Sequence, residues 1–205
     1  MTGRRWLRIC ASFAAAMATA LLAALAAGAH DTDLKDPNDV RGKLDVREVR
    51  LAHATGAPKW TIATFAEWGA FSMWDRGYLE VLLDTRREED PEYYVLIRSN
   101  RSELEGSLWR LQAVGPDSYL GGVAVTRPSR RGVSVQIGLW RLAFGDRRDF
   151  YRWRVHTLYT SDVCRRTCHD YAPNGTSVLQ WRPGRSPSPS VSPSPSPTDS
   201  PSPTP

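Results

Sequence analysis

Residues 151–159, Tyr-Arg-Trp-Arg-Val-His-Thr-Leu-Tyr, decide the fold class of this 205-residue chain. Aromatic or β-branched side chains alternate there with Arg152, Arg154 and His156, so one face of the segment is apolar and the other polar. A two-residue period of this kind predicts a β-strand with one buried and one wet face. Such strands are typical of antiparallel sheets.

The same period recurs along most of the chain. It is clear at residues 60–65, 78–84, 93–97 and 133–139, and weaker at 44–51, 103–111 and 120–126. Turn-forming Gly, Pro and Asp residues separate these segments, and we find no convincing amphipathic helix. About eight short strands predict an all-β fold, namely a two-sheet antiparallel β-sandwich of jelly-roll type. In the 44–51 segment the phase slips, which predicts a bulge near Arg47-Glu48.

The first 29 residues have the layout of a secretory signal peptide. Arg4, Arg5 and Arg8 form a positive head, an Ala-rich apolar run follows, and Ala27-Gly28-Ala29 is a small-x-small cleavage site. We therefore predict a secreted protein. The alternatives are an uncleaved membrane anchor and a twin-arginine signal. After cleavage no other apolar run approaches the length of a membrane span, so none is expected in the mature chain.

Removal of this leader changes the charge of the protein. Residues 1–29 carry three Arg and no acidic residue, so cleavage lowers the formal net charge from +5 by three, to +2. A nearly neutral chain has no broad basic field, and we expect no nucleic-acid partner.

Three zones follow the leader. Residues 30–43 form an acidic N-terminal segment, 44–182 the predicted sandwich, and 183–205 a Pro/Ser-rich tail. The tail has almost nothing to bury, so we expect disordered, polyproline-like chain. It could serve as a spacer or have no role beyond disorder.

Two cysteines remain in the mature chain, Cys164 and Cys168, because Cys10 leaves with the leader. In an oxidising compartment such a pair predicts a disulfide. The alternative is a redox-active or metal-binding pair, although no second Cys/His pair at zinc spacing accompanies it.

The acidic segment is the best metal candidate. Asp36, Asn38 and Asp39 offer the carboxylate and amide oxygens that Ca²⁺ prefers, and Asp45 follows a few residues later. Asp170, directly after the cysteine pair, is a further candidate ligand. The alternative is a solvated acidic terminus, with Asp170 in an ordinary turn. Calcium is the one cofactor that the sequence suggests.

Two groups of residues are candidates for ligand binding. Trp68 and Trp74 bracket a predicted loop and could form an aromatic platform, or could pack down over the core. Arg152, Arg154 and His156 could bind an anionic ligand such as an acidic polysaccharide, or could simply be the solvated face of a sheet.

Short motifs resemble known extracellular modules. These are Asp36-Pro37-x-Asp39-x-x-Gly42-x-Leu44-Asp45-Val46, Tyr78-Leu79-x-Val81-x-Leu83-Asp84-Thr85, and Trp153-Arg154-Val155-x-Thr157 with the cysteines and Asp170-x-Ala172-Pro173-Asn174-Gly175 after it. The first two resemble domains related to family-9 carbohydrate-binding modules and DOMON-like domains. The third is similar to the closing segment of small secreted proteins from Gram-positive bacteria. The resemblance implies a sandwich fold and an extracellular location.

Motifs of catalysis are missing from the sequence. There is no G-x-S-x-G, no H-E-x-x-H and no phosphate-binding Gly-rich loop. Our first hypothesis is therefore a secreted non-catalytic module that binds carbohydrate or a cell-wall polymer. The alternatives are a secreted structural or protein-interaction domain and an unrecognised hydrolase.

Overall fold

Residues 151–159 form most of the strand β9 (Tyr151–Ser161), whose apolar side chains are buried as the period predicts. The computed structural model describes residues 32–54, 57–86, 90–144, 151–161 and 163–181, and the structural statements below concern these residues. The predicted signal peptide (1–29) and Pro/Ser-rich tail (183–205) lie outside them.

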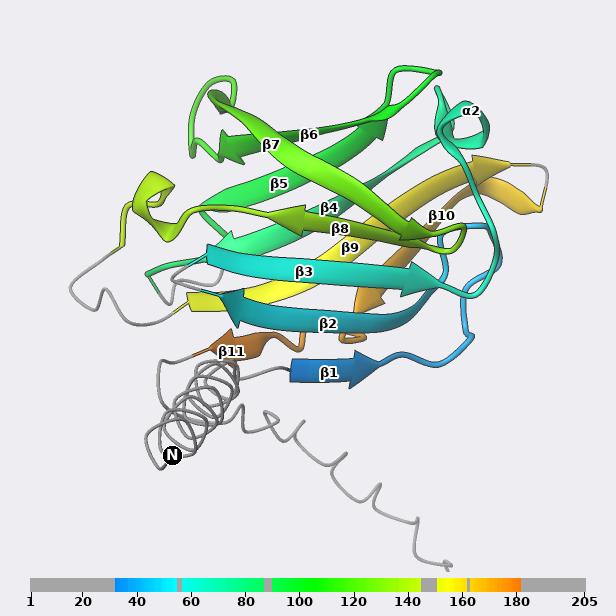
Figure 1. Ribbon diagram of the computed structural model, residues 1–205, viewed down its shortest axis with the longest axis horizontal. Coiled ribbons are helices and arrows are strands. Elements are labelled where there is room, and N and C mark those ends of the chain that lie inside the picture. Colours follow the sequence, from blue (N-terminus) through cyan, green and yellow to red (C-terminus); the bar gives the residue numbers. More distant parts are fainter. Residues whose placement is uncertain (1–31, 55–56, 87–89, 145–150, 162, 182–205) are drawn as a thin grey trace, which may run out of the picture.

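Eleven strands and two short helices make up the described chain, and all strand pairs are antiparallel. Besides β9, the elements are β1 (Thr32–Lys35), β2 (Val46–Ala54), β3 (Ala57–Thr64), α2 (Ala70–Met73), β4 (Gly77–Asp84), β5 (Tyr93–Ser99), β6 (Leu104–Arg110), β7 (Ser118–Ser129), β8 (Gly132–Gln136), the 3₁₀ turn η1 (Leu139–Arg141), β10 (Cys164–Ala172) and β11 (Leu179–Trp181) (Figure 1).

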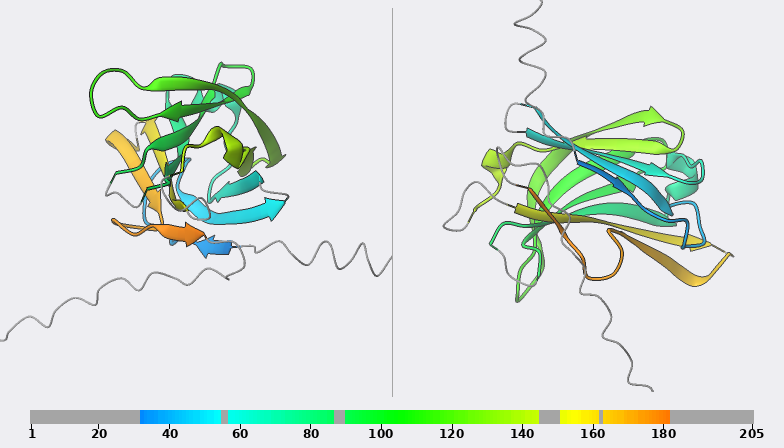
Figure 2. Two further views of the ribbon diagram at one scale, coloured as in Figure 1. Left: turned by 90° about the vertical axis from the view of Figure 1, so that its left-hand side faces the viewer. Right: turned by 90° about the horizontal axis from the view of Figure 1, so that it is seen from below.

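The strands form one sheet, so the predicted two-sheet sandwich is wrong. The order is β1-β2-β3-β8-β7-β6-β5-β4-β9-β10, with β11 paired to β9, and the sheet curls until it is nearly a closed barrel (Figure 2). The long strand β7 joins into one sheet the strands that would otherwise form two. Residues 118–123 pair with β6 and residues 124–129 pair with β8. A period of two gives each strand one inward face in a sandwich and in a barrel alike, and therefore cannot tell them apart.

The barrel closes through side chains where the edge strand β10 meets the start of β2, just beyond the pairing with β1. β10 lies against the start of β2, and the backbone N–H of Val46 donates to Oδ2 of Asp170 (2.6 Å). Next to it, the Thr157 hydroxyl on β9 donates to the carbonyl of Leu44 (2.7 Å). We call this junction the seam. Side chains there satisfy backbone groups that a further strand would otherwise pair.

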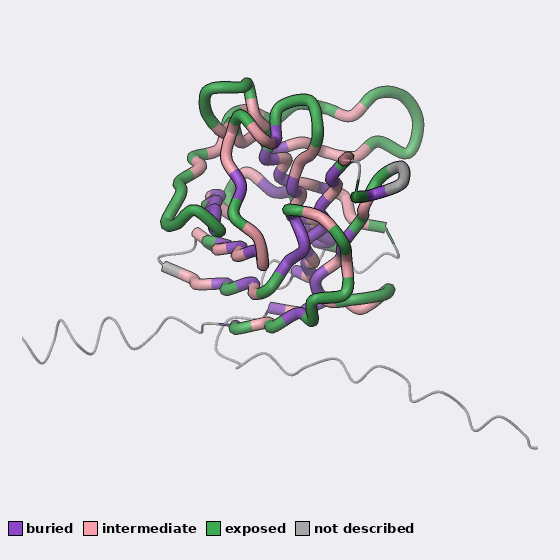
Figure 3. Tube along the Cα trace, turned by 90° about the vertical axis from the view of Figure 1, so that its right-hand side faces the viewer, coloured by how far each residue is buried: buried purple, intermediate pink, exposed green. Residues whose placement is uncertain are grey.

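The inward faces pack into one core. Trp60 of β3 and Trp153 of β9 meet edge to face with ring centroids 6.4 Å apart, and both are buried. Buried residues lie in the interior of the barrel, and the loops around it are mostly exposed (Figure 3). The predicted bulge is confirmed, because the register of β2 against β3 shifts between Val46 and Glu48.

The predicted disulfide is present and joins Cys164 to Cys168 in β10. The acidic segment contributes β1, an edge strand that the sequence pattern does not reveal. In the described part of the chain, no helix has the length and apolar character needed to cross a membrane.

Candidate functional site

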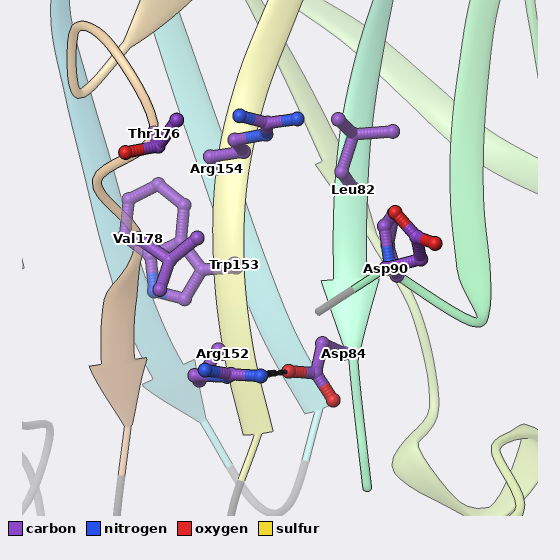
Figure 4. A pocket seen from close by; sticks show the side chains of 9 residues that line it. Leu82, Asp84, Asp90, Arg152, Trp153, Arg154, Thr176 and Val178 are labelled. Carbon is purple, nitrogen blue, oxygen red and sulfur yellow. Dashed lines mark hydrogen bonds and ion pairs between the residues drawn. The ribbon is translucent and has the colours of Figure 1, made fainter. Parts of the chain in front are cut away.

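A groove of about 500 Å³ lies on the outer face of the barrel, over β4 and β9 (Figure 4). The chain between β10 and β11 borders it on one side and the segment after β4 on the other. Its lining is Leu82, Asp84, Asp90, Pro91, Arg152, Trp153, Arg154, Thr176 and Val178. The volume is in the range of pockets that bind small molecules or single sugar units.

Arg152 and Asp84 face each other across the floor of the groove. They are register partners in the β4–β9 ladder, and the guanidinium forms an ion pair with the Asp84 carboxylate. Oδ1 of Asp84 also accepts from the backbone N–H of Arg86 (2.9 Å). Asp84 is only 6% exposed, and a buried carboxylate needs a partner of opposite charge. The Arg152 guanidinium is that partner.

Arg154 and His156 extend this polar face along β9. The Arg154 guanidinium lies over the ring of Tyr171, 4.8 Å from its centroid. His156 is 8% exposed, because its ring stacks on Tyr171 (centroids 4.5 Å apart) and hydrogen-bonds to Glu80 (2.8 Å) and His169 (3.0 Å). Arg154 lines the groove, whereas His156 does not and is buried against Tyr171, Glu80 and His169.

Next to the groove, aromatic side chains form a row across the outer faces of three strands. Tyr94 of β5 stacks on Trp109 of β6 with centroids 6.2 Å apart and planes 6° apart. Trp109 in turn contacts Tyr119 of β7 at 5.1 Å, and Tyr119 is 59% exposed. We call Tyr94, Trp109 and Tyr119 the aromatic row. Cross-strand aromatic pairs of this kind stabilise a sheet and present flat apolar surface.

Polar atoms edge the aromatic row. The Tyr94 hydroxyl donates to Oδ2 of Asp117 (3.1 Å), and the Trp109 indole N–H donates to Ser107 (2.8 Å). Burial, with the hydrogen bond to Asp117, raises the pKa of Tyr94 to about 12, so this phenol remains protonated at physiological pH.

The groove and the aromatic row are neighbours on the outer face of the sheet. Leu82 lines the groove and is the register partner of Tyr94, which begins the row. One outer face therefore offers guanidinium and carboxylate groups in a hollow and aromatic rings beside it. Charged planar groups can hydrogen-bond to hydroxyls, while rings can pack on apolar ligand faces.

The two predicted platform tryptophans lie elsewhere, near α2. Trp68 is 5% exposed, its N–H donates to Thr64 (2.9 Å), and the Arg127 guanidinium covers its ring at 4.2 Å. Trp74 is 44% exposed, with the Arg101 guanidinium 5.1 Å from its ring. Of the two, only Trp74 offers substantial surface to a ligand.

The predicted metal ligands are also brought together, at the seam. Asp36, Asp39 and Asp170 are joined by Asp45, and one carboxylate oxygen from each lies within 4.8 Å of the others. Asn38 is exposed in the same loop. Asp45 belongs to the same acidic motif but is not among the ligands that the sequence predicts.

Sequence reasoning missed the aromatic row. Since Tyr93 and Val95 point inward on β5, Tyr94 must point outward. The alternation in the sequence is enough to predict this orientation. The stacking of the three rings across β5, β6 and β7 cannot be predicted from the sequence, because it depends on the register between the strands.

Comparisons of this chain with protein-family models, curated proteins and solved structures gave no match.

Proposed function

We propose that this protein is an exported, non-catalytic module that binds extracellular polysaccharide or cell-wall polymer. The observation that carries the proposal is that the groove and the aromatic row lie on neighbouring strands of one outer face. Sugar rings have apolar C–H faces that pack on aromatic rings and hydroxyls that hydrogen-bond to guanidinium and carboxylate groups. The predicted leader and the disulfide support export.

The binding test compares two tryptophans on different parts of the barrel. The secreted protein is incubated with insoluble cellulose, chitin, xylan and purified Gram-positive cell wall, and the retained fraction is measured. We expect Trp109→Ala and Arg154→Ala each to lower retention roughly tenfold, since each removes a major contact of the proposed face. Trp74→Ala is the matched control, because Trp74 is a partly exposed tryptophan at the end of α2 that neither lines the groove nor belongs to the aromatic row.

Each outcome decides something. No retention on any polymer rejects the proposal, and loss with Trp74→Ala but not with Trp109→Ala rejects the proposed face. Release of soluble sugar during incubation would instead support the hydrolase hypothesis.

A protein-interaction domain is the second candidate. Phe71 (71% exposed) and Trp74 place apolar surface together at α2, with Arg101 over both rings. Exposed aromatic residues beside an Arg are common at protein interfaces.

A further inference from the structure

The acidic cluster at the seam draws its members from segments far apart in sequence. Asp36 directly follows β1, Asp39 lies in the next loop, Asp45 directly precedes β2, and Asp170 belongs to β10. One carboxylate oxygen from each lies within 4.8 Å of the other three. The cluster therefore sits where the first strands of the barrel meet the last.

Three of these carboxylates are buried with an oxygen that has no hydrogen-bond partner. Asp36, Asp45 and Asp170 are 7%, 2% and 2% exposed, and the atoms concerned are Asp36 Oδ2, Asp45 Oδ1 and Asp170 Oδ1. The other oxygen of Asp170 accepts from Val46, and that orients Oδ1. Buried polar atoms are almost always paired, so three orphaned oxygens together indicate a missing partner.

Among the described residues, no Lys, Arg or His forms an ion pair with the cluster. Asp39 accepts a hydrogen bond from the neutral amide of Asn174 (2.8 Å). Several buried carboxylates without a cation repel one another and lose their hydration.

Burial, and after it the neighbouring carboxylates, raises the pKa values of the cluster. Burial, followed by the charge of Asp170, raises the pKa of Asp36 to about 7 and that of Asp45 to about 6. Burial raises the pKa of Asp170 as well.

We propose that Asp36, Asp39, Asp45 and Asp170 bind one Ca²⁺ ion that joins the two edges of the sheet. Ca²⁺ binds oxygen ligands at about 2.3–2.6 Å, so opposite ligands lie up to about 5 Å apart, which matches the spacing of the cluster. All four ligands are carboxylates, the class that hard cations prefer. The ion ties the loop between β1 and β2 to β10 and thereby completes the seam. This role is independent of polymer binding.

The test is a Ca²⁺ titration of the full secreted chain after removal of divalent cations with a chelator. We expect one Ca²⁺ per chain with a Kd of about 1 mM or tighter, as in extracellular calcium modules. At about 100 times Kd, Ca²⁺ should raise the melting temperature by roughly 5–10 °C. Mg²⁺ should bind more weakly, because it demands shorter bonds and an octahedral arrangement.

The variant that tests the ligands is Asp36→Asn with Asp45→Asn, which keeps the shape of both side chains. It should bind Ca²⁺ at least tenfold more weakly and still fold in chelator, where loss of like charge favours the native state. Asp33→Asn is the matched control, since Asp33 lies three residues earlier in an exposed pair with Arg50. The proposal is overturned if the native chain neither binds Ca²⁺ nor gains melting temperature, if the double variant binds Ca²⁺ as tightly as the native chain, or if Mg²⁺ binds as tightly as Ca²⁺.

Discussion

Two regions of this barrel bury carboxylates, and they differ in what faces the negative charge. In the outer groove, Asp84 is 6% exposed and forms an ion pair with Arg152. At the seam, Asp36, Asp45 and Asp170 are buried to a similar degree, yet no ion pair of the described residues includes them.

The difference shows how each region is stabilised. A buried carboxylate needs a partner, and in the groove the neighbouring strand supplies one. At the seam the oxygens of four acidic residues converge, and the partner has to come from solution. In the groove, therefore, the chain itself supplies the charge partner of the buried carboxylate. At the seam, the carboxylates have a charge partner only when a cation is bound.

The largest expected contrast is the response to pH in a chelator. Asp36 and Asp45 have folded pKa values of about 7 and about 6, above their ordinary value of 3.8, because of burial and then neighbouring carboxylates. Between about pH 4 and pH 7 the folded chain therefore holds more protons than the unfolded chain, and the free energy of unfolding falls as pH rises. The two shifts set an upper limit of about 7 kcal/mol. Because solvent screens charges at the surface of the cluster, we expect a contribution on the order of 3 kcal/mol, measured by urea unfolding at several pH values.

The reference for this measurement is the Asp36→Asn, Asp45→Asn variant, in which both titrations are gone. The remaining charged groups of the seam, Asp39 and Asp170, are common to both proteins, as is His156, whose charge acts on Asp170. The native chain should lose stability relative to this variant as pH rises, and saturating Ca²⁺ should abolish the loss. Parallel pH profiles for the two proteins in chelator would contradict the comparison.

A smaller effect should come from the same chemical change made in each region. Asp84→Asn removes the ion-pair partner of Arg152, and we expect it to lower the free energy of unfolding by about 1–3 kcal/mol, since Arg152 is partly exposed. Asp45→Asn, measured in chelator at pH 7.5, should instead raise it by about 1–2 kcal/mol by relieving repulsion. Denaturant unfolding of the two variants checks the signs, and a loss in both would mean that the seam carboxylates already have a partner.

The sequence predicted the strands better than their arrangement. Alternation at 78–84, 93–97, 133–139 and 151–159 marks β4, β5, β8 and β9, and the slip near Arg47 marks a real bulge. The alternation of apolar and polar residues could not show that β7 pairs with both β6 and β8. Its residues are mostly exposed, and Gly121-Gly122 interrupts the alternation. Side-chain alternation records which face is buried and carries no information on which strand is the neighbour.

The candidate sites were predicted only in part, for a related reason. Residue type predicts Asp36, Asp39 and Asp170 as ligands, and the fold brings them together across more than 130 residues of sequence. Asp45 was in the motif, but only the seam shows that it faces the others. The aromatic row was missed because Tyr94 and Trp109 meet through strand register, a property of the folded sheet.

The smallest expected effect on stability concerns the disulfide, which belongs to the seam rather than the groove. Gly42 of the acidic loop has a φ of +136°, and a Cβ there would lie 3.5 Å from Sγ of Cys164, so the loop packs directly on the disulfide. The bridge closes a very short loop, so Cys164→Ser with Cys168→Ser should cost at most about 2 kcal/mol in unfolding free energy. Because the packing beneath the acidic loop changes, Ca²⁺ affinity should fall several-fold while polymer retention stays at the native level. Ca²⁺ titration and polymer retention of this one variant measure both regions, and equal losses in the two would show that seam and groove are coupled rather than separately stabilised.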